Sequence, residues 1–85
     1  MVFADIGFGN CLATHRMLSV VRPDSMPVKR LISEARERGM LIDATQGRKT
    51  EGVIVTDSGH VVLSYYTPER ILNAVKQAES KEEEE

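Results

Sequence analysis

The sequence comprises 85 residues with a formal net charge of −2 and a single cysteine, Cys11. A chain of this length forms one small domain with a limited core, and one cysteine cannot make an intrachain disulfide, so self-association is the expected source of extra stability. The chain shows no signal-like start and no apolar run near the roughly 18 residues of a membrane span, so we expect a soluble protein of a reducing cytoplasm.

The charge is distributed unevenly along the chain. Four of the 13 acidic residues form the terminal run Glu82 to Glu85, whereas residues 1–50 contain eight basic and five acidic residues, a net charge of +3. We therefore expect a single, mildly basic domain over residues 1–79 and an acidic, disordered tail over residues 80–85. This charge permits phosphate binding without establishing it, and the tail could either compete for a basic surface or only aid solubility.

The N-terminal quarter predicts short strands. Residues 3–9 show no helical period and indicate a strand that bends at Gly7 and Gly9, since glycine accepts a positive φ. Asn10–Arg22 predicts one or two strands with a polar break at Thr14–Arg16. Gly-Phe-Gly does not continue as a dinucleotide-binding motif, because Leu12 occupies the place of the third glycine.

A helix is predicted after Pro23. Asp24 or Ser25 can cap its free amides, Pro27 suits its first turn, and Gly39 is placed to end it. One apolar stripe follows the helical period: Val28, Leu31, Ile32 and Ala35. The other face has four cations and two anions, which fits either a recognition helix in a DNA groove or a face in contact with solvent or another subunit; we favour the second, because the charges there can pair with one another.

Three strand patterns follow, Met40–Thr45, Glu51–Asp57 and His60–Tyr66, and a second helix is predicted from Thr67 as its cap. The first two strands are predicted to form a β-hairpin with Arg48 and Lys49 at its tip. We therefore expect an α+β fold in which two helices accompany an antiparallel sheet of about four to five strands. Apolar residues project from both faces of this sheet, so either the C-terminal helix or a neighbouring subunit must cover the second face.

The residues that could support catalysis or bind a metal are few and scattered. Cys11 is followed by His15, but its place in an apolar strand predicts a buried, unreactive thiol. The only other histidine, His60, has no third ligand near it in sequence, so we expect neither a metal site nor another cofactor. A thiol or metal enzyme is therefore the least favoured class of function, and binding is favoured.

Arginine and lysine at an exposed turn favour an anionic partner. Arg48 and Lys49 of one copy would contact about two phosphates, and each contact changes the salt dependence of DNA affinity by only about 0.9 of a logarithmic unit. Repeated copies of the turn in an oligomer would add their contacts through effective concentration. Arg16 is either an exposed turn cation or a further part of this phosphate-binding surface.

Several segments resemble the RemA family of bacterial regulators of extracellular-matrix genes. The resemblance covers about Phe3 to Leu72 and is carried by five stretches: Asp5-Ile6-Gly7-Phe8-Gly9-Asn10, His15-Arg16-Met17, Pro27-Val28-Lys29-Arg30, Glu37-Arg38-Gly39-Met40-Leu41-Ile42-Asp43-Ala44-Thr45 and Gly47-Arg48-Lys49-Thr50. It implies a ring-shaped homo-oligomer that binds double-stranded DNA and regulates transcription of biofilm matrix genes.

The resemblance also implies roles for individual positions. Arg16, Arg48 and Lys49 match the family's DNA-contacting basic positions, whereas Pro27 and Arg30 lie in a segment connected with assembly. This sequence departs from the pattern at His15, where asparagine is expected, and at Glu51, where some relatives carry a cation. The alternative function is an oligomeric scaffold whose basic face binds an acidic protein.

Overall fold

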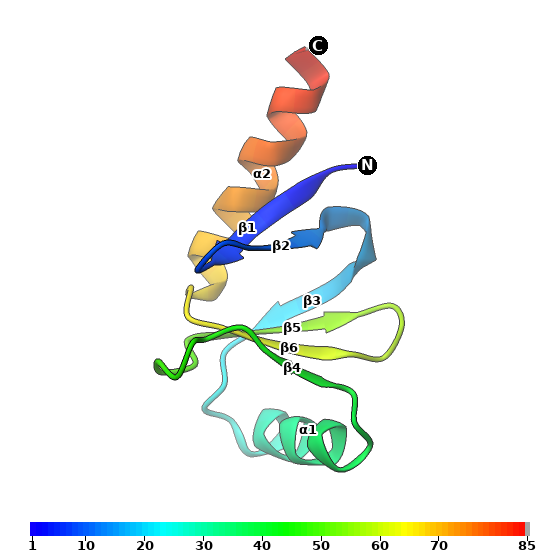
Figure 1. Ribbon diagram of the computed structural model, residues 1–85, viewed down its shortest axis with the longest axis vertical. Coiled ribbons are helices and arrows are strands. Elements are labelled where there is room, and N and C mark those ends of the chain that lie inside the picture. Colours follow the sequence, from blue (N-terminus) through cyan, green and yellow to red (C-terminus); the bar gives the residue numbers. More distant parts are fainter. Residues whose placement is uncertain (85) are drawn as a thin grey trace.

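A computed structural model describes the backbone of residues 1–84 and the side chains of residues 1–81 (Figure 1). The described chain contains two helices, six strands and one 3-10 turn. In order, these are β1 Phe3–Gly7, β2 Asn10–Ala13, η1 Thr14–Arg16, β3 Met17–Val21, α1 Met26–Glu37, β4 Leu41–Asp43, β5 Gly52–Thr56, β6 Val61–Ser64 and α2 Pro68–Glu84. Neither helix, within the residues described, meets the length and hydropathy that a membrane-spanning segment requires.

The central sheet has four strands in the order β3-β5-β6-β4. β5 pairs antiparallel with both β3 and β6, but β4 pairs parallel with β6, with Leu41 opposite Val61. β1 and β2 form a separate antiparallel pair. The α+β class and the two helices are confirmed, whereas the expectation of one antiparallel sheet is wrong: the central sheet is mixed, and the N-terminal pair is separate from it.

The predicted hairpin between the strands before and after Arg48 and Lys49 is also wrong. β6 lies between β4 and β5, so residues 44–51 form a loop that crosses the end of β6. The cause lies upstream, where α1 connects β3 to β4. A helical connection returns the chain to the end where β3 began, so β4 runs parallel to β3, and β6 runs in that direction too.

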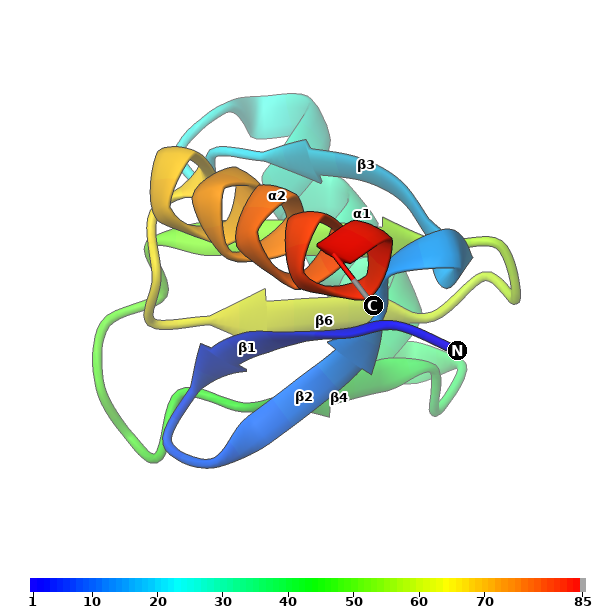
Figure 2. The same cartoon turned by 90° about the horizontal axis from the view of Figure 1, so that it is seen from above.

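Two apolar clusters occupy opposite faces of the central sheet. Figure 2 shows α2 on the near side of this sheet and the fainter α1 behind it. On one face, the stripe of α1 packs on Val53, Val61 and Leu63. On the other face, Ile6 of β1 and Ile71 of α2 pack on Ile54 and Val62. The prediction that apolar groups project from both faces is confirmed, and the N-terminal strand pair together with α2 covers the face that α1 leaves open.

The predicted starts of both helices and the predicted end of the first are confirmed. The Ser25 hydroxyl accepts the Val28 amide, and Gly39, with φ +70°, follows the last turn of α1. The Thr67 hydroxyl accepts the Arg70 amide at the start of α2. The α2 backbone continues through residues 80–84. The division into a domain and an acidic tail stays a prediction, and its last residue, 85, lies outside the described residues.

Cys11 is exposed, so the prediction of a buried thiol is wrong. Strand residues alternate between faces, and in β2 the inward position belongs to Leu12, which packs against the core cluster. Cys11 alternates to the other face of β2, away from this cluster.

Candidate nucleic-acid interface

The loop of residues 44–51, here called the basic loop, is fixed at its base. The Thr45 side chain is buried, and both its hydroxyl and its amide donate to Asp43 Oδ1, at 2.6 and 3.0 Å. The Arg48 amide then donates to the Thr45 carbonyl at 2.9 Å. Gln46 and Gly47 have φ of +55° and +78°, which makes the turn tight. The loop therefore holds Arg48 and Lys49 outward on a defined backbone.

The Asp43 carboxylate is well suited to this anchoring. The Thr45 hydroxyl bond lowers the pKa of Asp43 below its ordinary value, the Thr45 amide bond lowers it further, and the charge of Arg36 also contributes. Both Thr45 bonds favour the ionised form, so the anchor is complete at neutral pH.

Arg48 and Lys49 differ in their surroundings. Lys49 Nζ lies 3.6 Å from Glu51 Oε1, so part of its charge is balanced within the loop. Arg48 is exposed, and among the described side chains no carboxylate lies within 4.0 Å of its guanidinium. Arg48 is thus the cation of the basic loop whose charge is most available to an external anion.

Arg16 lies at the other end of the central sheet, directly before β3. Its Nε is 3.0 Å from Asp57 Oδ1, and its carbonyl accepts the Asp57 amide at 2.9 Å. Because Met17 pairs with Thr56, Arg16 adjoins the last residue of β5, whereas the basic loop precedes the first. The length of β5, roughly 16 Å at about 3.3 Å per residue, separates the two ends. A single copy therefore does not bring Arg16 and Arg48 together.

Pro27 and Arg30 are exposed on α1, outside the apolar stripe that packs on the sheet. Met26, the first residue of α1, is 69% exposed beside them. These residues form part of an outer surface that the described chain leaves uncovered.

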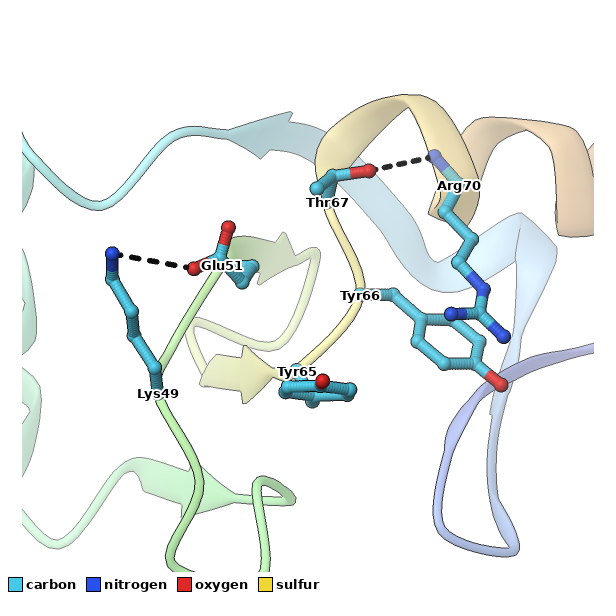
Figure 3. A pocket seen from close by; sticks show the side chains of 6 residues that line it. All are labelled: Lys49, Glu51, Tyr65, Tyr66, Thr67 and Arg70. Carbon is cyan, nitrogen blue, oxygen red and sulfur yellow. Dashed lines mark hydrogen bonds and ion pairs between the residues drawn. The ribbon is translucent and has the colours of Figure 1, made fainter.

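A basic residue that sequence reasoning missed lies near the basic loop. Arg70, in the first turn of α2, lines a pocket of about 420 Å³ together with Lys49 (Figure 3). The Arg70 guanidinium carbon lies 3.7 Å from the centre of the Tyr66 ring. The available signal in the sequence was the spacing of Tyr66 and Arg70, four residues apart across the start of a helix.

Comparison with known proteins gives one consistent result. The family model described as "RemA-like: Extracellular matrix regulatory protein A-like" matches residues 3–74. A protein of Caldicellulosiruptor saccharolyticus is 54% identical over 81 residues, covering 95% of this chain and 80% of its own length. One of Halothermothrix orenii is 61% identical over 67 residues, covering 79% and 80%. One of a Synechococcus species, strain JA-2-3B'a(2-13), is 59% identical over 69 residues, covering 81% and 78%. All three are named as regulatory proteins.

Proposed function

The chain belongs to the RemA-like family of regulatory proteins, and from this premise we propose that it is a transcriptional regulator that self-assembles and binds double-stranded DNA through repeated copies of the basic loop. Its regulated targets are extracellular-matrix genes, in keeping with the description of the family. The family and the relatives are named for regulation rather than for catalysis.

The observation that carries this proposal is the anchored, outward position of Arg48. Its side chain is exposed, its amide is bonded within the turn, and the turn is bonded to Asp43. A planar guanidinium on a fixed backbone can bind phosphate oxygens in a bidentate manner at a small entropic cost. Lys49 adds a second cation at the same place.

Assembly supplies the number of phosphate contacts that one copy lacks. The central sheet ends in two edge strands, and each exposes a large apolar residue: Leu18 of β3 is 70% exposed and Ile42 of β4 is 48% exposed. We infer a head-to-tail contact between unlike surfaces of neighbouring copies, including Pro27 and Arg30 of α1. A contact of this kind generates a ring when its rotation closes.

Head-to-tail assembly also provides a way to use Arg16. Within one copy Arg16 and Arg48 lie at opposite ends of the sheet, but a neighbouring copy could place its Arg16 beside the basic loop of the first. DNA would then contact Arg48 and Lys49 of one copy and Arg16 of the next. The ring would present this group of cations once per copy.

The test combines particle mass with DNA titration. The mass of the particle is measured by light scattering with and without duplex DNA, and the dissociation constant is measured by fluorescence anisotropy across a range of salt concentrations.

Arg48→Ala is expected to leave the free particle's mass unchanged and to weaken DNA binding at least about tenfold. It should also flatten the salt dependence by about 0.9 of a logarithmic unit for each phosphate that the variant no longer binds. Lys76→Ala, an exposed change on α2, is the control. Unchanged DNA affinity in Arg48→Ala would contradict DNA binding through the basic loop. A monomeric particle would contradict self-assembly.

The second candidate is an oligomeric scaffold for an acidic protein. It is favoured by the carboxylates that accompany two of the cations, Glu51 beside Lys49 and Asp57 beside Arg16, because they reduce the net positive charge that DNA would meet. Random-sequence duplex DNA at low salt separates the two candidates. Absence of binding there supports the scaffold.

A further inference from the structure

The pocket beside the basic loop brings together cations from two separate parts of the chain. Lys49 comes from the loop between β4 and β5, and Arg70 comes from the first turn of α2. Figure 3 shows their side chains on opposite sides of the hollow. The other residues that line the pocket are Glu51, Tyr65, Tyr66 and Thr67.

The guanidinium of Arg70 is held in place by an aromatic ring. It stacks on Tyr66 at 3.7 Å, and the Tyr66 hydroxyl donates to Asp5 Oδ2 at 3.1 Å, which fixes the ring against β1. Stacking on a ring leaves the edge of a guanidinium free to donate hydrogen bonds in its plane. No carboxylate among the described side chains lies within 4.0 Å of Arg70. Its charge is therefore ordered but not neutralised.

The start of α2 contributes little to the attraction of an anion. The Arg70 amide already donates to the Thr67 hydroxyl, and the Ile71 amide donates to the Thr67 carbonyl. The side chains of Lys49 and Arg70 consequently supply the positive charge of the pocket. Glu51 opposes them, because its carboxylate is one of the lining groups and lies 3.6 Å from Lys49.

We propose that this pocket binds a phosphate group of the DNA backbone between Lys49 and Arg70, which makes Arg70 a further DNA contact at the basic-loop end of the sheet. The proposal rests on the proposed function and extends it, since it assigns a DNA-contacting role to α2. Glu51 limits the affinity of this site by competing with phosphate for Lys49.

The test compares DNA binding by Arg70→Gln, Arg70→Lys and the control Lys76→Gln, an exposed charge change on the same helix. Arg70→Gln is expected to weaken DNA binding by about five- to tenfold and to flatten its salt dependence. Arg70→Lys should recover part of the affinity, because it restores the charge but not the stacked fork. Glu51→Gln should bind DNA more tightly than the wild type. Thermal melting and particle mass establish that each variant remains folded and assembled.

The outcomes distinguish a failure of this proposal from a failure of the proposed function on which it rests. If Arg48→Ala abolishes DNA binding and a folded Arg70→Gln does not weaken it, the pocket is not a DNA contact, although the proposed function stands. If the wild type binds no DNA, the proposed function itself fails. Titration with inorganic phosphate and adenosine monophosphate, followed by NMR shifts, tests the other source of phosphate. Arg70-dependent binding of these probes without Arg70-dependent DNA binding overturns the assignment to DNA.

Discussion

The two ends of the central sheet both carry cations, but they hold them differently. At the loop end, Arg48 and Arg70 have no carboxylate partner among the described side chains, and Lys49 forms an ion pair with Glu51. At the turn end, Arg16 is bound to Asp57 through both its side chain and its backbone. The partner of a cation, more than the number of cations, therefore decides which end is available to an external anion.

The turn end is also the more completely hydrogen-bonded of the two. Ser58 Oγ lies 2.7 Å from His60 Nδ1 and 2.9 Å from Thr56 Oγ1, and the Thr56 amide donates to the His60 carbonyl. These bonds connect the residues on both sides of the β5–β6 turn. The basic loop has its bonds at its base, and its cationic side chains extend beyond them. The bonds of the turn end join residues that are close in sequence. At the loop end, the surface beside the basic loop also includes residues from the start of α2.

The largest expected effect comes from disturbing that close approach of the loop end to α2. A Cβ at Gly52 would lie 2.5 Å from the Tyr66 carbonyl oxygen and 2.8 Å from Ile71 Cδ1. Gly52→Ala should therefore destabilise the fold by about 1–3 kcal/mol or more, because backbone must shift to make room. Chemical denaturation measures the free energy of unfolding.

Gly59→Ala at the turn end is the control. Its Cβ would meet only Met40 Cε at 3.8 Å, so only the backbone strain from its φ of +86° would destabilise it. Equal stability of Gly52→Ala and wild type would contradict the tight packing at the loop end.

A smaller effect is expected from separating Arg16 and Asp57. Their side chains are 51% and 41% exposed, so the pair contributes only about 0.2–1 kcal/mol to stability. If Arg16 contacts DNA, Arg16→Ala should weaken binding and reduce the salt slope by about one unit per contact, whereas Asp57→Asn should strengthen binding by freeing the guanidinium. Anisotropy titration of both variants measures this. A fall in DNA affinity of the same size in both would show that Arg16 acts only by holding the turn.

The smallest effect concerns acid and the base of the basic loop. The Thr45 bonds lower the pKa of Asp43 in the folded protein, so their stabilisation is fully present above the ordinary carboxyl pKa and is lost as the pH falls through the lowered value. The NMR shift of the Thr45 amide should therefore stay constant from neutral pH downward and change only below the ordinary carboxyl range. Asp43→Asn should abolish this titration. A change that begins at or above the ordinary range would contradict the anchoring role.

Local features of the fold were predictable because their causes are local. The polar break at Thr14–Arg16, the Ser25 and Thr67 caps and the glycine after α1 each act within a few residues. The mixed sheet was not predictable in the same way. Whether β4 pairs with β5 or with β6 depends on the direction that α1 imposes, and the short loop beside Gly47 favoured the nearer partner.

The candidate site shows the same division. The exposed, basic character of residues 48 and 49 follows from their own sequence, and the structure places both outside the core. The separation of Arg16 from Arg48 depends on strand order, which the sequence pattern left open. Arg70 was missed because its proximity to Lys49 arises only when α2 starts beside the basic loop.

The parallel pairing of β4 with β6 also determines when the central sheet can form as the chain is synthesised. β3 and β4 lie in the first 43 residues, yet their partners β5 and β6 end only at Ser64. As the chain is synthesised, β1 and β2 are the one strand pair that can close early, and α1 has no sheet on which to pack. β3 pairs only with β5 and β4 only with β6, so the central sheet needs the β5–β6 hairpin before either edge strand can join it. A nascent chain stopped before Ser64 would therefore lack the sheet residues on which the apolar stripe of α1 packs.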